Sequence, residues 1–314
     1  MKFVTYESSD GRQVAGVLTT NDTRILPLHS FADGKNADLD SVQAVIEGGD
    51  ESLERVRRIL AEADPQGAET LPCESVRLLA PLPRPVQIRD VLCFLDHMRN
   101  AARVGIELAG GDPSSYELPP VFEEAPIYYK ANRMGVVGHE ADVQWPAGCN
   151  LLDYELELGI VVGRQGKDIA REKGRDHVFG YTIFNDVSAR DIQMKEMTAG
   201  LGPSKGKDFD TGNVLGPCIV TADEVDPAEM TMIARLNGEE ISRGSTRQMD
   251  HKVEDVISYI SKGETIYPGE VLGSGTVPLG CLMEHKRFLA DGDVVELEIQ
   301  GIGVLRNRFV KTPN

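Results

Sequence analysis

Three carboxylates alternate along one short stretch of the chain. Residues 151–163 read LLDYELELGIVVG, and in a strand Asp153, Glu155 and Glu157 would share one face while apolar side chains take the other. Carboxylates two residues apart on a strand stand about 6.6 Å apart, which is close enough to hold one divalent cation between them. A solvated edge face gives the same pattern, because exposed carboxylates are the commoner case. The stretch therefore predicts either a metal site or a polar surface.

Two other stretches place chemically able residues beside helix starts. His97 lies in the first turns of a helix predicted at 95–107, and Asp90 precedes that helix. Asp186 ends a predicted strand in front of a helix, for which Ser188 and Asp191 are spaced as a capping box. A lone histidine is more often structural than catalytic, and an aspartate in an Asn-Asp pair is usually a turn residue. Both interpretations stay open from these residues alone.

The stretch GLGPSKGKDFDTGNVLGP at 200–217 is rich in glycine and superficially similar to a phosphate-binding loop. The glycine spacing is one residue too long for that motif, and Asp208 stands where a serine or threonine is required. We therefore reject a phosphate loop. The stretch is either a loop that brings Lys207 and Thr211 close to a ligand or an ordinary surface loop.

The chain divides best at a proline-rich connector, LLAPLPRPV, at residues 78–86. Short strand-like runs and two helix-like runs precede it, and a longer, mainly strand-like region with a few helices follows. These patterns predict a mixed α+β protein that is predominantly β, with a small N-terminal domain at 1–80 and a larger domain at 81–314.

Composition limits the partners of this protein. The 314 residues carry a formal net charge of −17, which argues against nucleic acid and anionic membrane surfaces and requires a local positive centre for any anionic substrate. The first residues lack the apolar core of a signal peptide, and no apolar run is long enough to span a membrane. The five cysteines are scattered and form no CxxC, so we expect reduced thiols in a cytoplasmic protein.

The order of several short motifs resembles the fumarylacetoacetate hydrolase family over roughly residues 85–310. The motifs are Asp90 before His97, Tyr129, DYELELG, FNDVSARDIQ, KDFDT, GSGT and Glu284. The resemblance implies a β-sandwich roll as the catalytic domain, a smaller N-terminal domain and a homodimer.

The resemblance also implies a metal site. It assigns Glu155, Glu157 and Asp186 as ligands, and Asp90 matches an additional aspartate of the fumarylacetoacetase-like branch. Carboxylate oxygens without histidine or cysteine suit a hard cation, so we expect Mg²⁺, with Ca²⁺ and Mn²⁺ as alternatives.

The same resemblance implies that His97 is the general base and that Glu284 orients it. Many smaller members carry a glutamate three residues after this histidine, but this chain has Asn100 there, as in the fumarylacetoacetase-like branch. A tyrosine of that branch is replaced by Leu92, so the exact substrate does not transfer. The positions that match substrate contacts are Tyr129, Arg190, Gln193, Lys207, Thr211 and Thr276.

The expected activity is hydrolysis of a carbon–carbon bond in a small anionic β-diketo acid such as an acylpyruvate. His97 would remove a proton from water, and Lys207 would help the metal to stabilise the enolate that leaves. The family scaffold also supports decarboxylation, hydration and tautomerisation, which are the first alternatives. A metal-binding module without activity is the second alternative, and a purely solvated carboxylate surface is the last.

Overall fold

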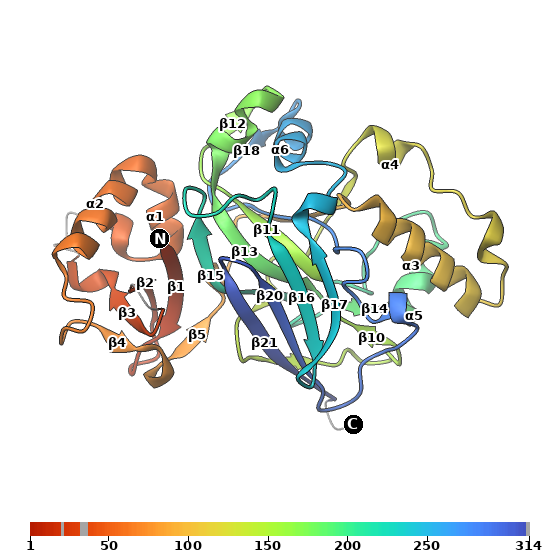
Figure 1. Cartoon of the computed structure of the whole chain (residues 1–314), viewed down its shortest axis with the longest axis horizontal. Coiled ribbons are helices and arrows are strands. Elements are labelled where there is room, and N and C mark those ends of the chain that lie inside the picture. The colour runs from red at the N-terminus through yellow and green to blue at the C-terminus, as the bar shows by residue number, and fades with distance from the viewer. Residues whose placement is uncertain (20–21, 32–36, 312–314) are drawn as a thin grey trace.

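The fold is built on two β-sheets that pack face to face (Figure 1). The computed structural model describes residues 1–19, 22–31 and 37–311. One sheet has twelve strands and the other has five, and apolar side chains from both enter one core, among them Ile183, Val220 and Leu297. A mixed, predominantly β architecture is therefore confirmed.

The large sheet carries most of the site that follows. Its path runs β4-β3-β2-β1-β15-β13-β11-β19-β6-β7, with β5 beside β1 and β8 beside β15. The strands are β1 Lys2–Glu7, β2 Gln13–Leu18, β3 Arg24–Pro27, β4 Leu71–Pro72, β5 Arg77–Leu79, β6 Ile88–Val91, β7 Tyr128–Lys130, β8 Val136–Val137, β11 Leu156–Val162, β13 Val178–Asp186, β15 Asn213–Thr221 and β19 Val271–Gly273.

The small sheet covers one face of the large sheet, in the order β17-β16-β20-β21-β9. Two further pairs of strands, β10 with β14 and β12 with β18, stand apart from both sheets. The bounds are β9 Asp142–Gln144, β16 Thr231–Leu236, β17 Glu239–Ser245, β20 Val294–Ile299, β21 Gly303–Val310, β10 Leu152–Asp153, β14 Ser188–Ala189, β12 Gly166–Lys167 and β18 Thr265–Ile266.

The N-terminal strands continue the large sheet, because β1 pairs antiparallel with β15. Helices α1 (Val42–Glu47) and α2 (Gly49–Glu62) pack against these strands through a second core that contains Phe3 and Val45. The pairing of β1 with β15 therefore joins the parts of the chain before and after the proline-rich connector by backbone hydrogen bonds. The division into domains at 80/81 stays a prediction.

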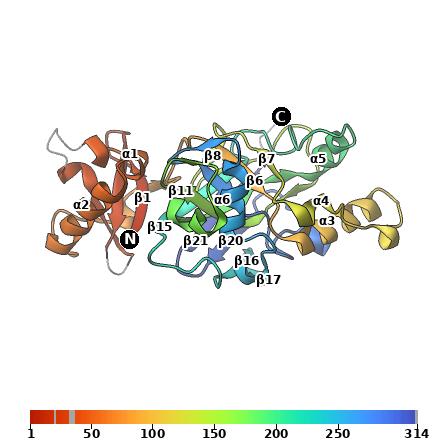
Figure 2. The ribbon, with the colours of Figure 1, turned by 90° about the horizontal axis from the view of Figure 1, so that it is seen from above.

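Three helices gather at the end of the molecule opposite the N-terminal strands (Figure 2). They are α3 (Leu95–Leu108), α4 (Val121–Glu124) and α5 (Arg190–Met197), and α6 (Val253–Ser261) lies elsewhere, beside β18. The backbone N–H of Leu95 donates to Asp250 Oδ2 at 2.9 Å, which satisfies one free donor at the start of α3. This contact fixes the end of α3 that carries His97.

The carboxylate stretch is not one continuous strand. It breaks at Tyr154 and Glu155, between β10 and β11, and there the N–H of Glu155 donates to the side-chain Oδ1 of Asn185 at 3.0 Å. Beyond the break, Glu157 has partners different from those of Asp153 and Glu155, which share Arg190. All three are buried within the described fold, so the interpretation as a solvated edge is wrong.

The capping box predicted for the helix after Asp186 is also wrong. Ser188 belongs to β14, and its hydroxyl donates to the carbonyl oxygen of Asp186 at 3.0 Å. Asp191 instead accepts the backbone N–H of Asn150 at 2.7 Å. The competing hydrogen bonds use both side chains, and α5 begins without a side-chain cap.

Among the described residues, no helix has the length and apolarity needed to cross a membrane.

A buried ion pair connects β6 to the segment that leads into β19. The guanidinium of Arg89 donates to Glu270 and to Glu264, and it lies 5.7 Å from the centroid of the Tyr128 ring. Arg89 and Glu270 are each 2 % exposed, so neither charge is solvated by bulk water. Since Asp90 follows Arg89 on β6, this pair also holds the strand that carries a predicted metal ligand.

We expect Arg89→Ala to lower the free energy of unfolding by about 3–5 kcal/mol, because it leaves the Glu270 carboxylate buried without its partner. Urea denaturation followed by circular dichroism measures the change. The control is Arg243→Ala, which breaks the exposed pair with Glu240 and should change stability by no more than about 0.5 kcal/mol. Equal losses in the two variants would contradict the assignment.

Candidate active site

Adjacent strands of the large sheet bring three of the predicted metal ligands close together. In the order β13-β11-β19-β6-β7, these strands carry Asp186, Glu157, Gly273, Asp90 and Tyr129, at different heights along the strands. Gly273 pairs with Asp90 on one side, and Asp90 pairs with Tyr129 on the other. Residues that are far apart in the sequence therefore meet because their strands are neighbours in the sheet.

Asp90, Glu157 and Asp186 form a carboxylate cluster. One oxygen from each lies within 4.8 Å of the others, and all three side chains are buried. Asp90 Oδ1, Glu157 Oε1 and Asp186 Oδ1 are buried without a hydrogen-bond partner. Unsatisfied buried oxygens are rare in proteins, and a buried cluster of three carboxylates that carries them is a suitable ligand set for a hard cation.

The charges of this cluster oppose one another. Burial and then the charge of Asp186 raise the pKa of Asp90 to about 7. Burial and the nearby Asp90 raise the pKa of Glu157 well above its usual value. Burial also raises the pKa of Asp186, although Lys207 opposes that shift. A divalent cation would favour the charged form of all three carboxylates, so the donor set fits such a metal.

Gly273 makes room for the cluster. A Cβ atom at this position would lie 2.6 Å from Glu157 Oε2 and 2.7 Å from Asp90 Oδ1. Any side chain would therefore push the two carboxylates apart. The next glycine, Gly275, donates its N–H to Glu157 Oε2 at 3.0 Å, which fixes the orientation of the Glu157 carboxylate.

Glu155 faces basic residues instead of the cluster. Its Oε2 accepts from Lys207 Nζ at 2.6 Å, and its Oε1 accepts from Arg190 Nη2 at 2.7 Å. Burial would raise the pKa of Glu155, but the charges of Arg190 and Lys207 outweigh burial and hold the pKa well below its usual range. Lys207 also donates to Asp186, to which Tyr129 donates its hydroxyl hydrogen. The role of Glu155 as a metal ligand stays a prediction.

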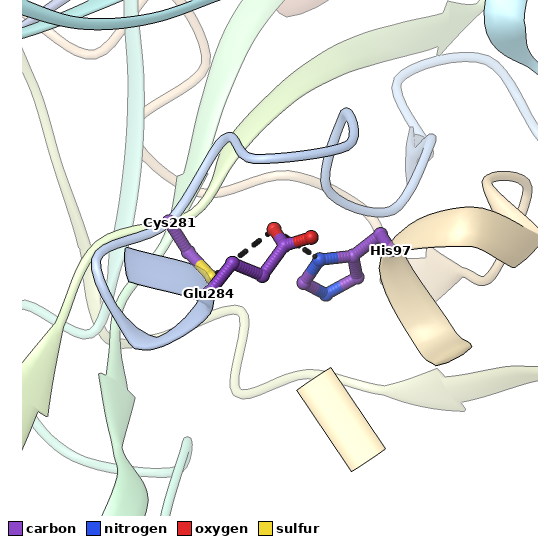
Figure 3. Close-up of side chains that lie close together, drawn as sticks. All are labelled: His97, Cys281 and Glu284. Carbon is purple, nitrogen blue, oxygen red and sulfur yellow. Dashed lines mark hydrogen bonds and ion pairs between the residues drawn. The ribbon is translucent and has the colours of Figure 1, made fainter. Parts of the chain in front are cut away.

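His97, in the first turn of α3, and Glu284 lie side by side, as Figure 3 shows. His97 Nδ1 lies 2.9 Å from Glu284 Oε2, and Asn100 Nδ2 donates to Glu284 Oε1 at 3.0 Å. The short helix η7 (Met283–His285) carries Glu284, and the thiol of Cys281 lies 3.5 Å from Glu284 Oε2. Asn100, which stands where many smaller family members have a glutamate, thus helps to orient the distant one.

Hydrogen bonds keep a proton on His97. Burial lowers the tendency of the ring to be charged, but hydrogen bonds with Cys281, Glu155 and Glu284 outweigh burial and raise the pKa of His97 well above its usual value. Its other nitrogen, Nε2, is 3.6 Å from Glu155 Oε1. The ring therefore has one nitrogen fixed by Glu284 and the other turned toward the carboxylates and basic residues.

Asp153 is a positioning residue that sequence reasoning set aside. It is fully buried, and its Oδ2 accepts from Arg190 Nε at 3.0 Å and Nη2 at 2.9 Å. It also accepts the backbone N–H groups of Leu282 and Met283, at 2.8 and 3.1 Å. Asp153 thus fixes both Arg190 and the turn that carries Glu284. The carboxylate stretch itself was the only signal, since long-range partners leave no local pattern.

A cavity of about 610 Å³ opens onto these groups. Its wall includes Leu92, which replaces the tyrosine expected by resemblance. Thr211 lies outside it, because its hydroxyl accepts the backbone N–H of Gln144 at 2.8 Å instead. The predicted site residues that line the cavity are Asp90, His97, Tyr129, Glu155, Glu157, Arg190, Gln193, Lys207 and Thr276. Asp186 and Glu284 support this wall from behind through Lys207 and His97.

A fixed histidine–glutamate pair beside buried, unsatisfied carboxylate oxygens defines an enzyme site that suits a divalent metal. Residues 87–310 match the family model described as fumarylacetoacetate (FAA) hydrolase C-terminal. The chain belongs to the fumarylacetoacetate hydrolase family, as its motif order predicted.

Known relatives of this chain cover most of its length. The human mitochondrial oxaloacetate tautomerase FAHD2A is 36 % identical over 268 residues, which are 84 % of this chain and 78 % of the relative. The oxaloacetate tautomerase YisK of Bacillus subtilis is 31 % identical over 98 % of this chain and 100 % of its own. The structure of the fumarylacetoacetate hydrolase EaFAH from Exiguobacterium antarcticum has a TM-score of 0.77 and 31 % identity, and the match covers 99 % of this chain and 100 % of that one.

We expect Mg²⁺ or Mn²⁺ to raise the melting temperature, because a ligand that binds only the folded state stabilises it by about 2.7 kcal/mol at 100 times its Kd. Glu157→Gln removes a cluster charge and should abolish most of this metal-induced shift. Differential scanning calorimetry with and without metal measures both values.

Glu239→Gln, at an exposed position of β17, is the matched control and should retain the full shift. Glu155→Gln reports separately whether Glu155 joins the ligands when metal binds. No shift in the wild-type protein, or an unchanged shift in Glu157→Gln, would contradict the metal site.

Proposed function

We propose that the protein is a metal-dependent tautomerase that moves a proton between carbon and oxygen in a small 2-oxo acid of the oxaloacetate type. The observation that carries this proposal is the His97–Glu284 pair, whose histidine lines the same cavity as Asp90 and Glu157 of the carboxylate cluster. The tautomerase names of two relatives, at 36 % and 31 % identity, support it. Tautomerisation is one of the alternatives that the motif resemblance left open.

Asp90, Glu157 and Asp186 would hold the cation, with Mg²⁺ expected first for an all-oxygen set and Mn²⁺ as the alternative. The chemistry that such a cation supplies when bound is polarisation of the substrate carbonyl oxygen as a Lewis acid.

Arg190 and Lys207 provide the local positive charge that an anionic substrate needs on a protein of net charge −17. Both are buried at the cavity wall, and their carboxylate partners hold them in place before a substrate arrives. Thr276 and Gln193 add polar groups at the same end. Preorganised charges of this kind stabilise the negative charge that develops on the substrate oxygen.

His97 is the group that transfers the proton. In the enol-to-keto direction, the protonated ring donates its Nε2 proton to C3 of the enol and then takes up the hydroxyl proton, so the protein ends in its starting state. Glu284 keeps Nδ1 protonated and stabilises the imidazolium while it carries the second proton. The His97 ring is buried, which keeps bulk water away from it.

We expect His97→Ala to lower kcat for oxaloacetate tautomerisation by about 10²–10⁴-fold, the usual contribution of a positioned acid–base group. Glu284→Gln keeps the shape but removes the charge that stabilises the imidazolium, so kcat should fall while KM changes little. Loss of the ultraviolet absorbance of the enol measures the rate.

The control is His29→Ala, since His29 is exposed in the N-terminal part and should leave the rate unchanged. Metal affinity measured in the same variants shows whether the site is intact. A His97→Ala variant that binds metal and keeps the wild-type rate would refute the assigned proton transfer.

Hydrolysis of a carbon–carbon bond in an acylpyruvate is the second candidate. The same pair can take a proton from water, and the cavity is much larger than a four-carbon acid requires. In that reaction His97 activates the water that attacks the distal carbonyl, and the bond between that carbonyl and the next carbon breaks. Lys207 and Arg190 would then stabilise the pyruvate enolate that leaves.

We expect a panel of acylpyruvates, fumarylpyruvate and oxaloacetate to separate these reactions in the Mg²⁺- or Mn²⁺-loaded protein. Pyruvate release from an acylpyruvate that disappears in His97→Ala would establish hydrolysis. Carbon dioxide release from oxaloacetate that persists in His97→Ala would instead establish decarboxylation, which needs no water-activating base. Enol loss without either product identifies tautomerisation alone.

A further inference from the structure

We propose that the part of the cavity along α3, which we call the apolar arm, binds an uncharged apolar substituent of the substrate. This proposal rests on the proposed function only for the position of the 2-oxo acid head beside His97. The arm begins at His97 and continues along one side of the helix past Ala102 and Gly105 to Ala109.

The arm is long compared with a four-carbon acid. Residues 97 to 109 span twelve steps along α3 and its C-cap, and a helix rises 1.5 Å per residue, so the wall extends about 18 Å. The small residues at 101, 102, 105 and 109 keep this side of the helix open. An oxaloacetate molecule at the His97 end would leave most of the 610 Å³ cavity unfilled.

The walls of the arm are apolar and adaptable. Four of the nine methionines of the chain line the cavity, and the residues are Met98, Met194, Met197 and Met283. Ile106 and the α4 residue Phe122 add further apolar surface. Methionine side chains are flexible and polarisable, and they line binding surfaces that accept apolar groups of varied shape.

Charge is confined to the opposite end. Among the described residues that line the cavity, the ionisable acids and bases other than tyrosine are Asp90, His97, Glu155, Glu157, Arg190 and Lys207. Those six belong to the site already described. The arm therefore lacks a basic side chain that could pair with a second carboxylate, and burying an unpaired carboxylate there would be unfavourable.

The substrate is the occupant that best fits this arm. The cavity that contains it also has Asp90 and Glu157 in its wall, and each of these residues carries a buried oxygen without a hydrogen-bond partner. A 2-oxo or 2,4-dioxo acid with an uncharged aliphatic or aromatic tail would place its polar head at these groups and its tail against α3. A dicarboxylate of the same length would not.

Gly105 offers a position at which the arm can be filled without touching the head site. A Cβ atom there would lie 3.4 Å from the terminal methyl carbon of Met283 and 3.9 Å from the sulfur of Met194, which are ordinary contacts. A leucine at this position would project into the arm. It would also suit the helix better than glycine, so the variant should fold.

The test measures binding of straight-chain 2-oxo acids, from pyruvate to 2-oxooctanoate, to the Mg²⁺- or Mn²⁺-loaded protein by isothermal titration calorimetry. We expect Kd to fall about fourfold for each added methylene, as expected for burial of an apolar chain. In Gly105→Leu, pyruvate should bind as in the wild type, whereas the gain for 2-oxooctanoate should fall at least tenfold. The dicarboxylate 2-oxosuberate should bind more weakly than 2-oxooctanoate.

Arg103→Leu, on the exposed side of α3, is the matched control and should retain the full dependence on chain length. A Kd that does not change with tail length, or tighter binding of the dicarboxylate, would overturn the proposal. Because the experiment measures binding, its result is separate from the proposed function. Turnover of oxaloacetate can fail while Kd depends on tail length, and turnover can succeed while Kd does not depend on tail length.

Discussion

Burial of several carboxylates in one small volume is the constraint on which the rest of the site depends. Asp90, Glu157 and Asp186 lie in the interior of a sheet, where charge is costly unless it is compensated. Lys207 compensates Asp186 only in part, and one oxygen of each cluster member stays without a partner. The fold thus tolerates a local cost that binding of a cation would relieve, which is typical of a functional site.

The structure separates two carboxylate environments that are close in sequence. Glu157 lies among acids, so its pKa is raised by burial and by Asp90, whereas Glu155 lies between two cations that lower its pKa. The break between β10 and β11 produces this difference over two residues. Neighbouring glutamates can therefore serve different purposes. Glu157 would contact a bound cation, whereas Glu155 holds the basic residues that line the cavity.

Much of this arrangement could be predicted from the sequence. The order of the motifs along the chain identifies a fold that local patterns alone do not define. The predominance of β structure and the helix that begins before His97 followed from local patterns, and the pairing of His97 with Glu284 followed from the resemblance carried by motif order. Long-range hydrogen bonds could not be predicted. Asn185 interrupts the carboxylate strand through its side chain, and Gln144 draws the Thr211 hydroxyl away from the cavity. Neither residue has a local pattern that reveals its partner.

The same head site is compatible with tautomerisation, decarboxylation and hydrolysis, because each reaction develops negative charge on an oxygen beside a 2-oxo acid. Selectivity must therefore come from groups that differ outside the shared head. In this chain those groups include Leu92 and the side of α3 that faces the cavity. A side chain at position 105 would reduce the volume of the cavity along α3, about two helical turns beyond His97, so substrate choice and proton transfer can vary independently. Such independence is a physical reason why one fold can serve several reactions.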